Sequence, residues 1–133
     1  DSKYRTIADR KSRAMAGLSM GGGQSWSIGL KHPEVFANIG IFSSGMFGGV
    51  TYKPFDLATE LPELLADPQA FNDNLDLFYI SCGETDPRIT HTKTAVEAMR
   101  ENGAEIHFSA FPGGHEWQPC RKSLHEMVQM LFK

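Results

Sequence analysis

Four short apolar runs alternate along this sequence with segments of helical spacing. The runs are 13–18 (RAMAGL), 35–42 (VFANIGIF), 75–82 (LDLFYISC) and 105–111 (EIHFSAF). Runs of this length, bounded by Gly, Pro or Ser, are typical of buried strands. Strands that alternate with helices predict an α/β fold with a parallel sheet and helices on both faces. In such sheets, ligands bind at the carboxyl ends of the strands.

The segments between these runs predict the helices and one loop. Helical segments are expected over 23–32, 92–103 and 121–132, short helical turns over 60–67 and 68–73, and a glycine-rich loop over 43–54. The first helix is expected to close at His32, because the residue before a proline is disfavoured in the α region. In the last one, Leu124, Met127, Val128, Met130, Leu131 and Phe132 are expected to form a broad apolar face.

The composition is that of one globular unit. The chain has 133 residues, of which 41% are hydrophobic and 22% charged, and a formal net charge of −3. Without a cluster of Lys and Arg, neither a nucleic acid nor an anionic membrane surface is expected as a partner. No apolar run approaches the roughly 20 residues that a membrane-spanning helix needs. Cys82 and Cys120 lack C-x-x-C spacing, and two buried free thiols are favoured over a disulfide bridge.

The strongest motif joins the first strand to the first helix. Gly17-Leu18-Ser19-Met20-Gly21 fits G-x-S-x-G, in which a nucleophilic serine stands on a sharp turn between strand and helix. The alternative is a plain glycine-rich turn. Side chains at positions 17 and 21 are expected to collide with the neighbouring strand and helix. In this geometry the backbone N–H of Met20 is expected to stabilise an oxyanion.

A serine nucleophile needs a base, and the base needs an acid. Asp86 follows the third strand and His115 follows the fourth, in the order Ser, Asp, His that suits the motif. Glu84 is the competing acid, and Asp86 has the alternative of a turn or N-cap residue beside Pro87. The other histidines abut a proline, begin or lie within helices, or lie inside a strand: His32, His91, His107 and His125.

Two motifs for other chemistry are incomplete. HEMVQ (125–129) has Gln129 where a zinc site needs a second histidine. The glycines at 21–23 lack dinucleotide-binding spacing, and no P-loop lysine follows. We therefore expect no metal and no cofactor.

Three segments carry a resemblance to a known family. RAMAGLSMGGGQS, CGETDP and GGHEWQPCRKSLHEM resemble the esterase family of the α/β-hydrolase superfamily that includes feruloyl esterases of plant cell-wall degradation. The resemblance implies a triad of Ser19, Asp86 and His115, and esters of hydroxycinnamic or short acyl groups with sugars as substrates. It also implies a secreted or periplasmic location. Trp117 either walls the acyl site or anchors the last helix. Trp26 stands where members of the family carry a smaller apolar residue.

Members of this family carry about as much chain again before the nucleophile, including the loop that gives the second oxyanion donor. Residues 1–133 are therefore expected to be the carboxyl-terminal part of one α/β-hydrolase domain. Because losing one oxyanion donor costs about 10²–10³ in rate, this part alone is expected to be nearly inactive. Its first strand is expected to form an open edge, and the chain either forms a homodimer through this edge or has lost the segment that pairs with it. The alternatives to a serine esterase are an acyltransferase of the same fold and a non-catalytic carbohydrate-binding or partner-binding module.

Overall fold

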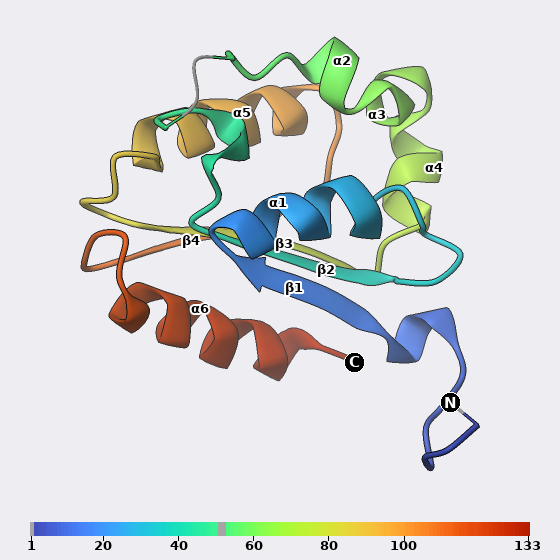
Figure 1. Ribbon diagram of the computed structural model, residues 1–133. Coiled ribbons are helices and arrows are strands. Elements are labelled where there is room, and N and C mark those ends of the chain that lie inside the picture. The colour runs from blue at the N-terminus through green and yellow to red at the C-terminus, as the bar shows by residue number, and fades with distance from the viewer. Residues whose placement is uncertain (1, 51–52) are drawn as a thin grey trace.

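The computed structural model describes residues 2–50 and 53–133, and its centre is a four-stranded parallel sheet (Figure 1). The strands are β1 (Ala14–Leu18), β2 (Asn38–Phe42), β3 (Leu77–Gly83) and β4 (His107–Phe111), and they lie side by side in this order. Each lies within or next to a predicted run, which confirms the predicted α/β sheet. Leu18 is opposite Phe42, and Gly83 is opposite Phe111, so all four carboxyl ends reach the same edge.

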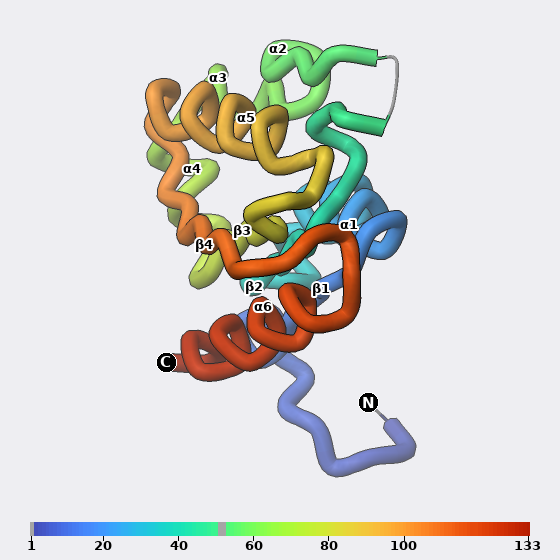
Figure 2. Tube along the Cα trace, turned by 90° about the vertical axis from the view of Figure 1, so that its left-hand side faces the viewer, coloured from blue at the N-terminus to red at the C-terminus, as the bar shows by residue number. Residues whose placement is uncertain are grey.

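Helices cover both faces of the sheet, as predicted. α1 (Met20–Gln24), which continues as a π-helical turn over Ser25–Gly29, lies on one face with α5 (Ile89–Glu101), and α6 (Trp117–Met130) lies alone on the other (Figures 1 and 2). The short helices α2 (Leu57–Glu60), α3 (Pro62–Ala66) and α4 (Pro68–Asp73) precede β3. Of the predicted loop 43–54, Gly45–Phe47 forms a 3₁₀ turn, and Thr51 and Tyr52 lie outside the described residues.

The boundaries of three predicted helices differ in the structure. α5 begins at Ile89, three residues before the predicted start, and the first and last helices also differ. The first helix begins at Met20, directly after the turn, and its π-helical end is Gly29 rather than His32. The last helix begins at Trp117, four residues before the predicted start. Glycines and a proline in the first turns of the first and last helices hid their beginnings.

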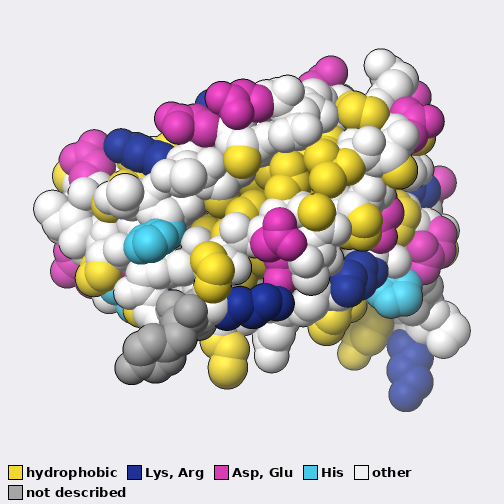
Figure 3. Space-filling model, turned by 90° about the horizontal axis from the view of Figure 1, so that it is seen from above, with side chains coloured by type: hydrophobic (Ala, Val, Ile, Leu, Met, Phe, Trp, Pro, Cys, Tyr) yellow, Lys and Arg dark blue, Asp and Glu magenta, His cyan; other side chains and the backbone are white. Residues whose placement is uncertain are grey.

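The main core fills the space between the sheet and the helices on the face that carries α1 and α5. Trp26 is almost fully buried there, and its ring meets Phe47 and Phe55 edge-on at centroid distances of 5.3 and 5.8 Å. Edge-to-face aromatic pairs of this kind are favourable beyond their buried area. The outer surface of this helical layer shows hydrophobic side chains gathered across its middle, with charged side chains around them (Figure 3).

The face of α6 that meets the sheet is narrower than expected. Of the six apolar side chains predicted for this face, only Met127 is buried, against Phe42 and Tyr79. Met130 and Leu131 are partly buried against the same cluster, whereas Leu124 and Val128 are about half exposed and Phe132, beyond the helix, is exposed. The buried positions are Pro119, Cys120, Ser123 and Met127. Gly40 makes room for this contact, because a Cβ there would lie 2.4 Å from the Met127 sulfur. The broad apolar face was therefore a wrong prediction.

Both cysteines, Cys82 and Cys120, are buried free thiols, as predicted. Among the described helices, none is long and apolar enough to span a bilayer.

Candidate active site

Ser19 occupies a strained turn at the carboxyl end of β1. Its φ of 56° and ψ of −114° lie in a region that residues with a side chain rarely adopt. Its backbone N–H donates to the Phe42 carbonyl of β2 at 2.8 Å, which fixes the turn to the sheet. Such strain persists only where the surrounding structure holds it, and it is typical of functional sites.

The two glycines of the motif differ in what they allow. A Cβ at Gly17 would lie 2.1 Å from the backbone of Gly21, so the turn closes only without a side chain there. At Gly21 a Cβ would have nothing within 4 Å beyond the helix's own backbone, so the predicted collision at that position is wrong. The tight position in the helix is Gly22 instead, where a Cβ would lie 3.0 Å from the Cβ of Ser44.

The loops after β1, β3 and β4 bring three polar side chains into one hydrogen-bonded chain. The Ser19 hydroxyl lies 3.0 Å from Nε2 of His115, and Nδ1 of His115 lies 2.9 Å from Oδ2 of Asp86. With the proton on Nδ1, the ring donates to Asp86 and accepts from Ser19. Figure 2 shows how the loop between β4 and α6 reaches across to the start of α1. This arrangement allows His115 to take the proton of Ser19.

Asp86 is buried and its charge is compensated. Its Oδ1 accepts from the backbone N–H of Arg88 at 3.0 Å and from Nη1 of the same residue at 2.9 Å. Burial opposes ionisation, but the hydrogen bonds from Arg88 and His115 outweigh it and hold the pKa of the carboxyl below its ordinary value of 3.8. Asp86 is therefore a carboxylate near neutral pH. Glu84, the competing acid, is exposed.

The other histidines have surroundings of their own. His32 pairs with Glu34, His125 contacts Gln129, and His107 stacks on Tyr79. His91 is the third residue of α5.

The loop that carries His115 is shaped by a residue that sequence reasoning missed. Oε1 of Glu116 accepts from the Gly114 N–H at 3.2 Å. Gly113, at φ 118°, adopts a backbone conformation that favours glycine, and a Cβ there would lie 2.7 Å from the same oxygen. The signal in the sequence was the acidic residue directly after Gly-Gly-His.

The two remaining predicted site residues each begin a helix. Met20 is the first residue of α1, where a backbone N–H has no acceptor within the helix, and it follows Ser19 directly. Trp117 is the first residue of α6, two positions after His115, and 63% of its surface is exposed. This exposure does not fit the alternative in which Trp117 anchors the helix by burial.

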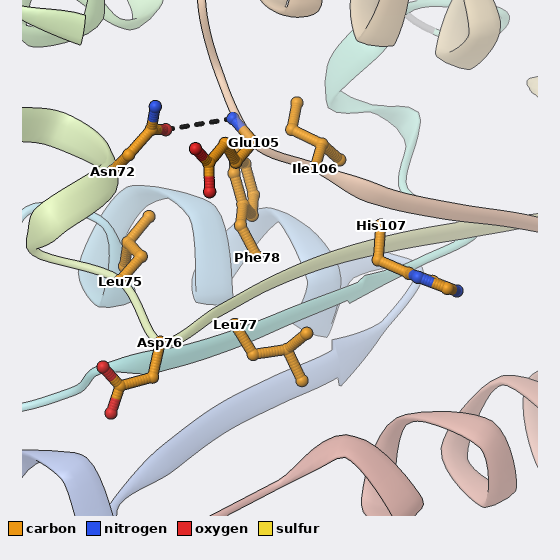
Figure 4. A pocket seen from close by; sticks show the side chains of 8 residues that line it. All are labelled: Asn72, Leu75, Asp76, Leu77, Phe78, Glu105, Ile106 and His107. Carbon is orange, nitrogen blue, oxygen red and sulfur yellow. Dashed lines mark hydrogen bonds between the residues drawn. The ribbon is translucent and has the colours of Figure 1, made fainter. Parts of the chain in front are cut away.

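A hollow lined by both polar and apolar side chains lies at the opposite end of the sheet. Asp76, Glu105 and His107 contribute to its lining, at the amino ends of β3 and β4, and Asn72 accepts from the Glu105 N–H (Figure 4). In parallel α/β sheets the ligand site is at the carboxyl ends, where Ser19 lies. In the described part of the chain, no group of three or more His, Cys, Asp or Glu side chains is arranged to hold a metal ion.

Comparisons with known proteins place this geometry in a family. The family model described as "Putative esterase" matches residues 1–131. An endo-1,4-beta-xylanase/feruloyl esterase of Xylanibacter ruminicola is 34% identical over 134 residues, which cover the whole of this chain and 16% of that protein.

Two solved structures have the same arrangement of elements. A ferulic acid esterase matches with a TM-score of 0.75 and 25% identity, over 98% of this chain and 55% of its own. A ferulic acid esterase from Anaeromyces mucronatus matches with a TM-score of 0.73 and 21% identity, over 98% of this chain and 48% of its own. This chain thus spans about half the length of these structures. It has the α/β-hydrolase fold and belongs to the esterase family.

Proposed function

We propose that this chain carries the catalytic triad of a serine esterase that cleaves carboxylic esters, with feruloyl and short acyl esters of plant cell-wall sugars as substrates. The observation that carries the proposal is the chain of hydrogen bonds from Asp86 through His115 to Ser19. The names of the relatives in Xylanibacter ruminicola and Anaeromyces mucronatus support the choice of acyl group.

In the proposed mechanism, His115 Nε2 takes the Ser19 proton while Oγ forms a bond to the ester carbonyl carbon. The carbonyl π-electron pair moves onto the oxygen, and the Met20 N–H stabilises the resulting oxyanion. The intermediate collapses, the bond to the leaving alkoxide breaks, and His115 returns the proton to that oxygen. Water then attacks the acyl-enzyme by the same steps. Asp86 stays ionised and holds the ring in the required tautomer.

Hydrolysis of methyl ferulate and p-nitrophenyl acetate tests this proposal. We expect Ser19→Ala to lower turnover of both esters by about 10⁴-fold or more, because no other group replaces the nucleophile. The assay uses this chain and any longer natural protein that contains it. Labelling of Ser19 by a fluorophosphonate, located by mass spectrometry, is a second readout. Unlabelled Ser19, or no turnover in the longest natural form, would contradict the proposal.

Trp117 is the proposed wall of the acyl site, since its exposed ring lies two residues from His115. An aromatic ring adds contact for a hydroxycinnamoyl group that an acetyl group cannot use. We therefore expect Trp117→Ala to raise KM for methyl ferulate by up to about tenfold. The KM for p-nitrophenyl acetate is expected to stay within about twofold of that of the unmodified chain. Equal effects on both substrates would argue against this role.

A further inference from the structure

The carboxylate of Asp86 has its two oxygens assigned to different partners. Oδ1 receives both the backbone N–H and Nη1 of Arg88, whereas Oδ2 faces Nδ1 of His115 at 2.9 Å. A carboxylate held by two donors on one oxygen has little freedom to rotate. The contacts from Arg88 to Oδ1 therefore keep Oδ2 of Asp86 directed toward the base, His115.

Arg88 is itself enclosed. Its side chain is only 12% exposed, and that of Asp86 is fully buried. The segment after β2 lies over it, since a Cβ at Gly49 would be 2.9 Å from the Arg88 Cα. The Arg88 carbonyl accepts from the Thr92 hydroxyl, which ties its backbone to α5. Water has little access to this ion pair, so its electrostatic effect on neighbouring groups is weakly screened.

The ion pair is not arranged for greatest stability. Within the described residues, Nε of Arg88 is buried and has no hydrogen-bond partner. An unsatisfied buried N–H is costly, and buried ion pairs are often no more stabilising than apolar side chains of similar volume. A role in positioning Asp86 accounts for an arginine here better than a purely stabilising role does.

The two buried thiols near Asp86 are neutral near pH 7. Burial raises the pKa of the Cys82 thiol in β3 to about 11, and it also raises the pKa of the Cys120 thiol in α6. Glu116, in the loop of His115, is directed to the Gly114 N–H. Arg88 is thus the cation in direct contact with Asp86.

We propose that Arg88 is a positioning residue of the triad, which orients Asp86 toward His115 and partly neutralises it, so that His115 stays unprotonated to lower pH. This inference rests on the proposed function. The sign follows from charge: Asp86 stabilises the protonated ring, and the nearby Arg88 cation weakens that effect. Removing the cation strengthens the hold of Asp86 on the protonated ring. The ring then takes up its proton at higher pH, and the base is lost earlier as the pH falls.

The experiment follows the ring of His115 by NMR during a pH titration, with the signal assigned by His115→Gln. In Arg88→Gln we expect the midpoint of the His115 titration to rise by roughly one pH unit. The acid limb of the pH profile of kcat/KM is expected to shift to higher pH by the same amount. Arg88→Lys keeps the positive charge but loses the planar guanidinium group with its several N–H donors. For this variant we expect an unchanged midpoint of the His115 titration and a kcat about tenfold lower. Arg100→Gln is the matched control, because Arg100 lies in α5, the helix that Arg88 directly precedes, and donates to the Ile106 carbonyl instead.

A folded Arg88→Gln variant with the midpoint of the unmodified chain would overturn the inference. If this variant does not fold, as judged by circular dichroism, Arg88→Lys decides: a lowered kcat with an unchanged midpoint supports positioning, and an unchanged kcat overturns it. Because the ring titration needs no turnover, failure of the esterase proposal is seen separately, in the Ser19→Ala assay. A shifted midpoint without ester hydrolysis would leave the electrostatic link standing and remove its catalytic meaning.

Discussion

At the scale of single residues, the turn at Ser19 depends on the absence of a side chain at Gly17. Gly17 and Gly21 flank the serine symmetrically in the sequence, but only Gly17 is pressed against backbone atoms. A flexible side chain can move away from a new methyl group, whereas backbone of a strained turn cannot. The two glycines therefore have different physical roles, and the symmetric motif does not reveal this.

We expect Gly17→Ala to lower the free energy of unfolding by about 3 kcal/mol or more, because the new Cβ meets backbone at 2.1 Å. Gly21→Ala is the matched control and is expected to change it by less than about 1 kcal/mol, in the stabilising direction, since alanine favours helix. Urea denaturation followed by circular dichroism measures both. Equal destabilisation by the two substitutions would contradict the different roles that we assign to Gly17 and Gly21.

At the scale of elements, β1 differs from its neighbours. It pairs with β2 on one side, and within the described residues no strand pairs with its other side. Its side chains at Ala16 and Leu18 are exposed. Unpaired strand edges with small or apolar side chains tend to pair with another chain, and a lysine on such an edge opposes this.

We propose that isolated copies of this 133-residue chain associate through β1. Light scattering over a range of concentrations is expected to show a dimer, and Ala16→Lys is expected to shift it toward monomer. Leu124→Lys, on the half-exposed side of α6, is the control and should leave the dimer intact. A monomer at every concentration, or equal effects of both lysines, would rule out pairing through β1.

At the scale of the whole molecule, the sheet was predictable because its strands are short apolar runs in the same order in sequence and space. The meeting of Ser19, Asp86 and His115 was predictable for the same reason, since all three follow strands whose carboxyl ends share an edge; their roles stay a proposal. The start of α6 was missed because Pro119 resembles a helix breaker, although a proline is tolerated in the first turn.

The contacts of Arg88 and Glu116 could not be read from periodicity, because they depend on how two loops fold back on themselves. The narrow buried face of α6 was missed for a related reason. The rotation of a helix about its axis is decided by the surface beneath it, here the gap left by Gly40, and not by its own apolar residues alone.

The hydrogen bond between Ser19 and His115 joins residues 96 positions apart, and the one between His115 and Asp86 spans 29. Parallel strands also pair only across long connections, so this chain must close large loops before its contacts form. Every strand must be in register before the serine meets its base. We therefore expect the hydrogen-bonded triad to form late in folding, after the four strands of the sheet have paired.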